Sequence, residues 1–252
     1  MAQKQRQEQI LHILESQKYV TVRYLSHMLH YSTATINRDL NALQALGLVK
    51  RSFGGVEAVS GRHLPPLPVR QFYMQKEKRH NAAEAAKLIQ NGETIFLDGS
   101  TTVQHIARYL IDKKDLTVIT NNMSLAVELG KYEIHVICLG GQIVERPHVL
   151  GGEDTVEHAM KYRADKAFIS VNSITLAGDV TGTSHYLLRH VMLQNSNEAY
   201  LLTDRAKIAE SLPKKLCDFS ALTGVISDFV FPEETIAKYP NVRFICSTTK
   251  KE

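Results

Sequence analysis

Residues 94–102 read TIFLDGSTT, a short apolar run that ends in a carboxylate, a glycine and three small hydroxyl residues. The apolar run predicts a buried β-strand, and Val103, Ile106, Ala107 and Leu110 follow at the spacing of an amphipathic helix. A strand, a short loop and a helix in this order are typical of an α/β domain. The free N–H groups and the dipole at the start of such a helix favour an anion such as phosphate.

Similar apolar runs recur along the second part of the chain, and helix-like segments lie between most of them. The further runs are LTVIT from 116, IHVICL from 134, KAFISV from 166, AYLLT from 199, LTGVIS from 222 and VRFIC from 242. Strands that are apolar throughout are typical of a mainly parallel sheet covered by helices on both faces. We therefore expect an α/β fold for this part of the chain.

Polar residues follow these runs, where the carboxyl ends of the strands would lie. Ligands of open α/β sheets bind at that edge. The residues concerned are Asp98–Thr102, Thr120–Asn122, Gly140–Gly141, Asn172–Ser173, Thr203–Arg205 and Lys207. Taken singly, a GSTT loop is often only a helix cap and a Gly-Gly pair only a turn. Their recurrence at one edge favours a phosphate site, with Lys207 as a source of positive charge.

The N-terminal part predicts three helices followed by a hairpin. The first helix covers about residues 5–16, Thr21 and Ser32 are candidate N-caps of the second and third, and Gly47 would end the third. The turn of about three residues between the second and third helices is typical of a helix-turn-helix. The stretch LVKRSFGGVEAV, from 48 to 59, predicts a hairpin wing.

The outer face of the third helix carries small, amide-bearing and basic side chains, while Asp39 turns away from it. Small residues allow close approach to a DNA major groove, amides read adenine, and arginine pairs with guanine or a phosphate. The candidate DNA contacts are Ser32, Thr33, Thr35, Asn37, Arg38 and Asn41, with Lys50 and Arg51 of the hairpin. The alternative is a three-helix bundle used for packing or protein contacts.

The distribution of charge bears on that alternative. Residues 1–62 contain eight Lys/Arg and four Asp/Glu, which leaves twenty-two of each in the remainder, so the whole formal charge of +4 lies in the first quarter. This asymmetry favours a polyanionic partner for the N-terminal part.

Three prolines, Pro65, Pro66 and Pro68, interrupt every periodicity between the two parts. We therefore expect a DNA-binding domain over residues 1–58, with its motif at 20–39, a linker over 59–75 and an effector-sensing domain over 76–252.

Other function classes lack their signatures. The three cysteines are far apart, the histidines lack metal-ligand spacing on a helix face, and the nucleophile, zinc and nucleotide motifs are missing. We expect no cofactor and no metal. No apolar run is long enough to span a membrane and the N-terminus lacks a signal, so we expect a cytoplasmic protein.

The blocks YVTVRYLSHMLHYSTATINRDLNALQALGLVKRSFGGVE, IFLDGSTT, LTVITNN, VICLGGQIV, ADKAFISV and LLTDRAKIA, in this order, resemble the DeoR family of bacterial transcriptional regulators. The resemblance covers nearly the whole chain. It implies a winged helix-turn-helix, and a sensor domain similar in fold to ribose-5-phosphate isomerase. It also implies a double-stranded DNA operator, a phosphorylated sugar or related metabolite as effector, and a homo-oligomer, either a dimer or a tetramer.

The same resemblance implies roles for single residues. It places phosphate contacts at Asp98, Gly99, Ser100, Thr101 and Thr102, and implicates residues 20–39 in DNA binding, with Arg38 foremost. It adds Asn121, Gly141, Asp165 and Lys207 to the effector pocket. The chain departs from the family pattern in two places: Asn37 stands where the first of two arginines is usual, and SHYLLRH, from 184, stands where the helix usually starts with a glutamate.

Three functions follow as hypotheses. The first is a repressor of sugar-metabolism genes controlled by a phosphorylated sugar. The second is an isomerase-like enzyme with an N-terminal appendage, which would need a positioned base such as Asp98, Asp179 or Asp204. The third is a repressor that acts without a ligand. An isomerase has no need of a basic helix-turn-helix, so we expect the first hypothesis and no enzymatic activity.

Overall fold

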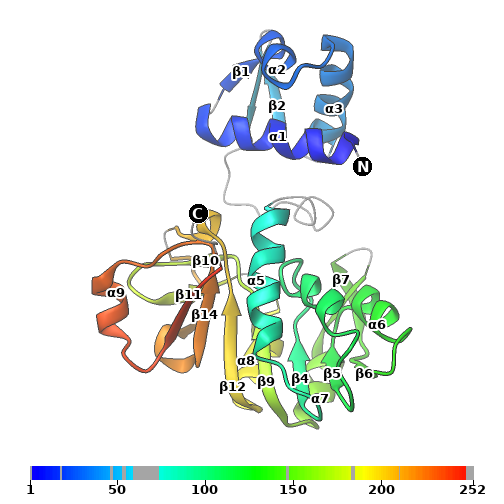
Figure 1. Ribbon diagram of the computed structural model, residues 1–252, viewed down its shortest axis with the longest axis vertical. Helices are drawn as coiled ribbons and strands as arrows, with labels where there is room; N and C mark the ends of the chain where they lie inside the picture. The colour runs from blue at the N-terminus through cyan, green and yellow to red at the C-terminus, as the bar shows by residue number, and fades with distance from the viewer. Residues whose placement is uncertain are drawn as a thin grey trace. The chain divides into compact units, whose positions relative to one another are not determined.

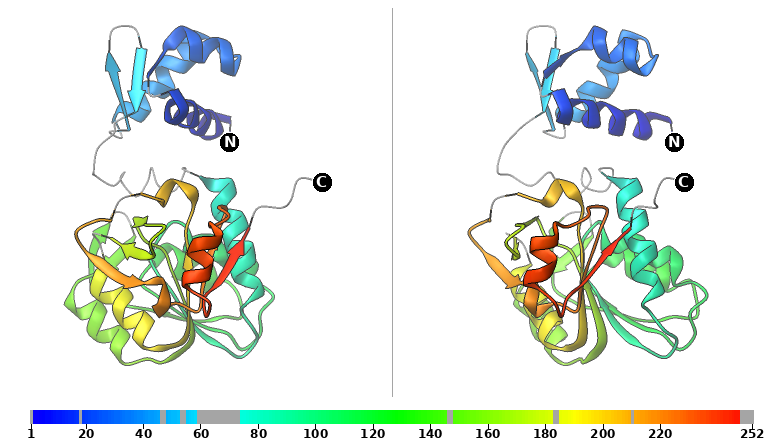
Figure 2. Two further views of the ribbon diagram at one scale, coloured as in Figure 1. Left: turned by 90° about the vertical axis from the view of Figure 1, so that its left-hand side faces the viewer. Right: turned by 60° about the vertical axis from the view of Figure 1, so that its left-hand side comes forward.

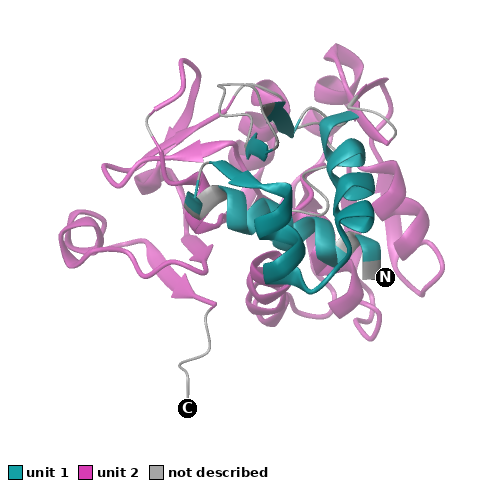
Figure 3. Cartoon of the chain, turned by 90° about the horizontal axis from the view of Figure 1, so that it is seen from above, with its two compact units in different colours: residues 1–74 teal, residues 75–252 magenta. Residues whose placement is uncertain are grey.

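The computed structural model describes residues 2–17, 19–45, 48–52, 55–58, 74–145, 148–182, 185–209 and 211–247. The chain forms two compact units, residues 1–74 and 75–252 (Figure 3). The predicted linker lies outside the described residues as far as residue 73, so the proposed domain boundaries stay a prediction. In the described part, no helix combines the length and the apolar character needed to cross a bilayer.

The N-terminal unit is three helices and a small sheet (Figure 1). Its helices are α1 (Ala2–Gln17), α2 (Val22–Leu29) and α3 (Thr33–Ala45). Its strands are β1 (Tyr19–Thr21), β2 (Val49–Ser52) and β3 (Gly55–Ala58), in the antiparallel order β1-β3-β2. The sequence predicted the β2–β3 hairpin but missed β1, a three-residue strand whose burial alternates too briefly to be recognised.

Both predicted N-caps are present. The Thr21 hydroxyl accepts a hydrogen bond from Tyr24 N at 3.1 Å, and the Ser32 hydroxyl accepts one from Thr35 N at 3.2 Å. Between them α2 ends at His30, which adopts a left-handed conformation with φ 57°. The predicted C′ residue, Gly47, lies outside the described residues.

The second unit is built on seven parallel strands, which correspond to the seven apolar runs. In spatial order they are β15 (Arg243–Cys246), β14 (Gly224–Ser227), β12 (Ser196–Leu202), β9 (Ala164–Ile169), β4 (Thr94–Leu97), β5 (Thr117–Thr120) and β6 (His135–Cys138). All six pairings are parallel. In β4, Ile95 and Leu97 pack into one apolar cluster and Phe96 into the other, so both faces are buried.

Helices cover the two faces of this sheet (Figures 1 and 2). One face packs against α5 (Gln75–Lys87), the 3-10 helix η1 (Val103–Tyr109) and α6 (Met123–Leu129). The other packs against α7 (Glu153–Met160) and α8 (Tyr186–Gln194). The remaining helix α9 (Glu233–Lys238) and the 3-10 turns η2 (Arg205–Lys207) and η3 (Phe219–Ala221) lie in the C-terminal part of the unit.

Two small antiparallel sheets were not predicted. One joins β10 (Ser173–Ile174), β11 (Asp179–Thr181) and β13 (Lys215–Asp218), and the other joins β7 (Gln142–Glu145) and β8 (Val149–Gly151). Their strands have two to four residues, too few for a periodic signal.

A buried ion pair ties the first helix of the N-terminal unit to the third. Asp39 of α3 is fully buried, and the Arg6 Nε of α1 donates a hydrogen bond to its carboxylate. This hydrogen bond raises the pKa of Arg6, whose guanidinium also lies 4.5 Å from the centre of the Tyr31 ring. The pair explains why Asp39 turns away from the outer face of α3.

We predict that Arg6→Met destabilises the N-terminal unit by about 3–5 kcal/mol, because it leaves a buried carboxylate without its counter-ion. Hydrogen-exchange mass spectrometry of the full chain should show faster exchange in peptides from residues 2–45 and unchanged exchange in peptides from 75–247. Lys50→Met is the matched control, since Lys50 is exposed and its nitrogen lies 3.8 Å from Glu57. Equal effects of the two substitutions would contradict the prediction.

Candidate functional site

The loop that follows β4 is buried and internally ordered. The Asp98 carboxylate accepts hydrogen bonds from Ser100 N at 3.0 Å, from Ser170 N at 3.2 Å and from Arg189 Nε at 2.7 Å. The Ser100 hydroxyl accepts a hydrogen bond from Val103 N at 3.2 Å and so caps η1. Asp98 therefore fixes the loop to the end of β9 and, through a buried ion pair, to α8.

Gly99 is required by close packing. A Cβ atom at this position would lie 2.6 Å from the Val149 side chain and 3.1 Å from the Asn121 amide. Asn121, at the carboxyl end of β5, is itself buried and donates to Leu150 O at 2.7 Å. Its Oδ1 atom is buried and has no hydrogen-bond partner within the described residues. The structure thus brings Asn121 against the loop, as expected for a shared edge of the sheet.

Two lysines that are distant in sequence converge on neighbouring threonines of the loop. The Lys78 ammonium, from α5, donates to the Thr101 hydroxyl at 3.2 Å, and the Lys207 ammonium, from η2, donates to the Thr102 hydroxyl at 3.3 Å. Lys207 also donates to the Ser170 hydroxyl at 2.7 Å. Phosphate oxygens are acceptors like these hydroxyls, but they carry charge, so they would form stronger bonds with the same ammonium groups.

The charged side chains of this group sum to a positive value. Lys78, Lys207 and Arg189 contribute three positive charges, while Asp98 and Asp204 contribute two negative ones. Burial, and then the neighbouring Lys78, Arg108 and Arg79, lower the pKa of His105 to about 4, so its imidazole is neutral at pH 7.

Gly141 packs against β8 and α7, and the loop that follows β4 is not among its close neighbours. It has a φ of 132°, and a Cβ there would lie 2.0 Å from the Thr155 hydroxyl and 2.7 Å from Gly151 O. A side chain cannot fit at this position. Gly141 therefore allows the start of β7 to pack against β8 and α7, and its neighbours are residues of those elements.

Asp165 is not brought to the loop, which corrects its place among the pocket residues. It is the second residue of β9, and its carboxylate accepts a hydrogen bond from Thr94 N, the first residue of β4, at 2.8 Å. Because β4 and β9 are parallel, their first residues lie at the amino edge of the sheet, opposite the edge that carries Asp98. Asp165 therefore joins the start of β9 to the start of β4.

Three residues of the group were missed by the sequence reasoning. Ser170 directly follows β9, whereas we expected that strand to continue to Val171, with Asn172 as the first polar residue after it. Lys78 and Arg189 lie within helices, one before and one long after the loop, and only the tertiary fold brings them together. The available signal was Arg189 itself, a single arginine inside the apolar stretch YLLRHVML.

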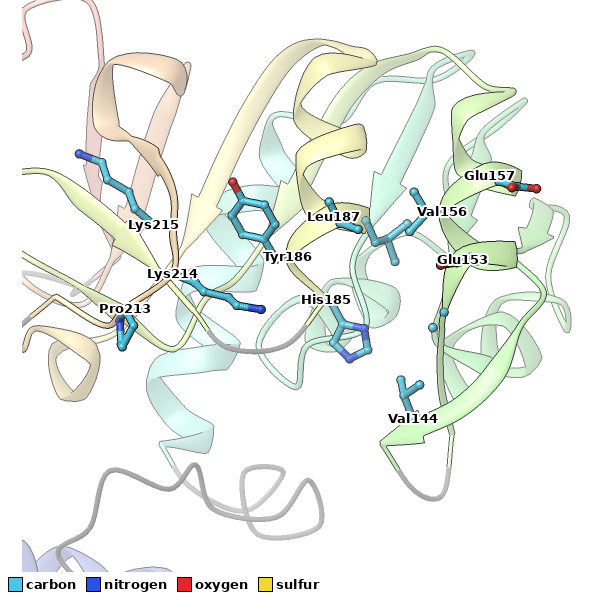
Figure 4. A pocket seen from close by; sticks show the side chains of 13 residues that line it. Val144, Glu153, Val156, Glu157, His185, Tyr186, Leu187, Pro213, Lys214 and Lys215 are labelled. Carbon is cyan, nitrogen blue, oxygen red and sulfur yellow. The ribbon is translucent and has the colours of Figure 1, made fainter.

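The second unit also contains a cavity of about 1080 Å³ (Figure 4). Its walls come from β7, α7, α8 and residues 213–215, and its lining includes Val144, Tyr186, Leu187 and Lys214. His185 also lines it. The next helical turn after His185 carries Arg189, so α8 connects the cavity to Asp98. Across the described residues, we find no cluster of three or more His, Cys, Asp or Glu side chains arranged to hold a metal.

The N-terminal unit presents most of the predicted DNA contacts on its surface. Ser32, Thr33, Arg38, Asn41 and Lys50 are exposed, while Thr35, Asn37 and Arg51 are half-buried. The hydroxyls of Ser32 and Thr35 lie 2.9 Å apart and share a hydrogen bond at the start of α3. Asn37 and Arg51 are in contact, because Arg51 Nη2 donates to Asn37 Oδ1 at 2.8 Å and to Asn37 O at 3.2 Å.

Comparison with known proteins covers both units. Residues 6–62 match the family model of the DeoR-like helix-turn-helix domain, and residues 74–229 match that of the DeoR C terminal sensor domain. The chain is 28% identical over 231 residues to the glycerol-3-phosphate regulon repressor of Escherichia coli K12, with 90% of this chain and 92% of that protein covered. It is 29% identical over 235 residues to the HTH-type transcriptional repressor GlcR of Bacillus subtilis, with 90% and 89% covered.

Among solved structures, ribose 5-phosphate isomerase from Plasmodium falciparum aligns with a TM-score of 0.41 and 15% identity over 54% of each chain. The relatives that match at higher identity are named as regulators. HTH-type transcriptional regulator YulB of Bacillus subtilis, described as uncharacterized, is 31% identical over 228 residues, with 89% of this chain and 88% of that protein covered. The two family models together cover most of the sequence, and the chain belongs to the DeoR family of helix-turn-helix transcriptional regulators.

Proposed function

We propose that this regulator is a repressor of sugar-metabolism genes, and that a phosphorylated sugar or related metabolite bound in the second unit sets its affinity for DNA. The convergence of Lys78 and Lys207 on Thr101 and Thr102 carries the proposal. A phosphate would accept hydrogen bonds from both ammonium groups and from the N–H groups that open η1.

The proposed effector residues divide by role. Ser100, Thr101, Thr102, Lys78 and Lys207 would contact the phosphate. Asp98 and Arg189 would hold the loop in place, and Gly99, Asn121 and Gly141 would shape the surrounding backbone. The printed name of the Escherichia coli relative refers to a phosphorylated three-carbon compound, which supports this class of effector for the present chain.

The proposed DNA-binding surface consists of Ser32, Thr33, Thr35, Asn37, Arg38, Asn41, Lys50 and Arg51. A homo-oligomer, a dimer or a tetramer, would bind repeated half-sites of a double-stranded operator and so multiply the affinity of a single unit. The proposed location is the cytoplasm, where a bacterial regulator would meet its operator.

We infer that the second unit is a sensor and not an isomerase. A general base must be able to approach the substrate carbons. Asp98 is engaged by Arg189 and by two backbone N–H groups, and the Asp204 carboxylate lies 3.7 Å from the Lys207 ammonium. These contacts suit carboxylates that organise a binding site.

We predict that one phosphorylated sugar, and not its unphosphorylated parent, raises the melting temperature of the full chain. Binding to the folded state at a hundred times Kd stabilises it by about 2.7 kcal/mol. The shift should be lost in Lys207→Ala and in Lys78→Met, each measured against its own unliganded baseline. Lys87→Ala is the matched control, since Lys87 is an exposed lysine of the same helix as Lys78. If no phosphorylated sugar shifts the melting temperature of a chain that still binds DNA, the result would favour a repressor that acts without a ligand.

We predict that Arg38→Ala weakens DNA binding by about 1–3 kcal/mol, because Arg38 is an exposed arginine on the outer face of α3. Fluorescence anisotropy should use a duplex enriched from a random-sequence pool by the unsubstituted chain. The thermal response to the effector should be retained. Arg243→Ala, an exposed arginine of the second unit, removes the same charge and should leave DNA affinity unchanged. Full DNA affinity in Arg38→Ala would show that α3 is not the recognition helix.

A further inference from the structure

A side-chain hydrogen-bond contact joins the recognition helix to the wing, beside the apolar packing of Val49 against the core of the unit. Arg51 of β2 places its Nη2 atom 2.8 Å from Asn37 Oδ1 and 3.2 Å from Asn37 O, so a single guanidinium nitrogen holds both the side chain and the backbone of α3. The two residues are fourteen apart in sequence. This contact therefore adds a polar link between two elements that also share the core of the unit.

The direction of Arg51 follows from the pleat of β2. Val49 is buried in the core of the unit, and Arg51, two residues later, points to the same face of the strand. Lys50 points to the opposite face, where its side chain is 73% exposed and its nitrogen lies 3.8 Å from Glu57. The two neighbouring basic residues of the wing thus have different surroundings, although the sequence places them side by side.

The charge of Arg51 is not balanced inside the unit. A guanidinium stays charged at any ordinary pH. No carboxylate lies within salt-bridge distance of Arg51 in the described part of the chain, and its buried Nε has no hydrogen-bond partner there. The carboxylates of Asp39 and Glu57 are engaged by Arg6 and Lys50. A half-buried cation in this state favours an external anion.

The contact also limits what Asn37 can do. Recognition of adenine by asparagine uses the amide oxygen and the amide nitrogen together. Arg51 donates to the Asn37 oxygen, which uses one of its two lone pairs and fixes the orientation of the amide. Asn41, one helical turn later, is exposed, and its amide has no side-chain partner in the described residues. Of the two asparagines, Asn41 is the better placed to read a base.

We propose that Arg51 binds a phosphate of the DNA backbone and that Asn37 is a positioning residue, which fixes the Arg51 guanidinium and does not read sequence. This assignment rests on the proposed DNA-binding function. It makes the wing and the recognition helix a single rigid surface, in which a backbone contact sets the depth and register at which Arg38 and Asn41 meet the bases.

A double-mutant cycle on the full chain tests the proposal. Asn37→Ala, Arg51→Ala and the double variant are titrated over a range of salt concentrations, on the selected duplex and on a random-sequence duplex of 25 base pairs. Arg51→Ala should weaken binding to both duplexes about tenfold. It should also lower the slope of log affinity against log salt concentration by about one. Asn37→Ala should weaken both by a smaller common factor, and the double variant should be no weaker than Arg51→Ala.

Arg51→Lys separates charge from geometry. A lysine keeps the positive charge but not the planar guanidinium whose Nη2 atom holds Asn37, so the salt slope should be preserved and Asn37→Ala should have no effect in this background. Asn41→Ala is the contrasting amide variant: it should change the base preference found by selection, whereas Asn37→Ala should not. Hydrogen exchange of residues 2–45 checks that each variant is folded.

The outcomes are distinct. Additive losses for Asn37→Ala and Arg51→Ala, or an altered base preference in Asn37→Ala, would overturn the assignment of Asn37 while the DNA-binding function stands. An unsubstituted chain that binds neither duplex would overturn the proposed function, and this assignment with it.

Discussion

The parallel pairing of β4 with β5 and with β9 is the constraint on which the sensor unit depends. Strands that run the same way end at the same edge, so residues 70 or more positions apart meet there without any local sequence signal. The Asp98 carboxylate marks this edge: it closes its own loop through Ser100 N, reaches the end of β9 through Ser170 N, and joins α8 through Arg189. The loop geometry that suits a phosphate is therefore a property of the whole sheet.

Two helical elements outside the strands, one before β4 and one between β12 and β14, supply further groups to this loop. Lys78 comes from α5 and Lys207 from η2, and both reach hydroxyls of the same loop. The hydroxyls that accept these hydrogen bonds are neutral, while the Asp204 carboxylate lies 3.7 Å from the Lys207 ammonium. An arriving phosphate would exchange neutral acceptors for charged ones at unchanged positions, so it would gain electrostatic attraction and require little rearrangement of the protein. Since α5 is the first element of the second unit, a ligand held by Lys78 also contacts the part of the sensor nearest in sequence to the DNA-binding unit.

The elements that could be predicted from the sequence are those whose pattern is long enough, or local enough, to be recognised. All seven apolar runs became strands of one sheet, and the caps Thr21 and Ser32 are formed, because apolar runs and capping hydroxyls act over a few residues. The strand β1 and the small antiparallel sheets were missed because each strand is too short for periodicity to appear. Asp165 was assigned to the pocket by family resemblance, and only the parallel register shows that it begins β9 at the far edge. Lys78 and Arg189 depend on tertiary contacts alone.

Basic side chains in both units fall into two kinds, and the distinction carries functional meaning. Arg6 with Asp39, and Arg189 with Asp98, are buried cations whose charge is met by a buried carboxylate. Such pairs hold elements together, and removing one partner is costly because the other charge remains. Arg51 is also held in place, yet the contact that holds it within the described residues is the neutral amide and backbone carbonyl of Asn37. A cation that the fold positions with neutral groups keeps its attraction for an anion from outside. On this reasoning Arg51 differs from the arginines that support each unit, because its surroundings position the guanidinium without neutralising its charge.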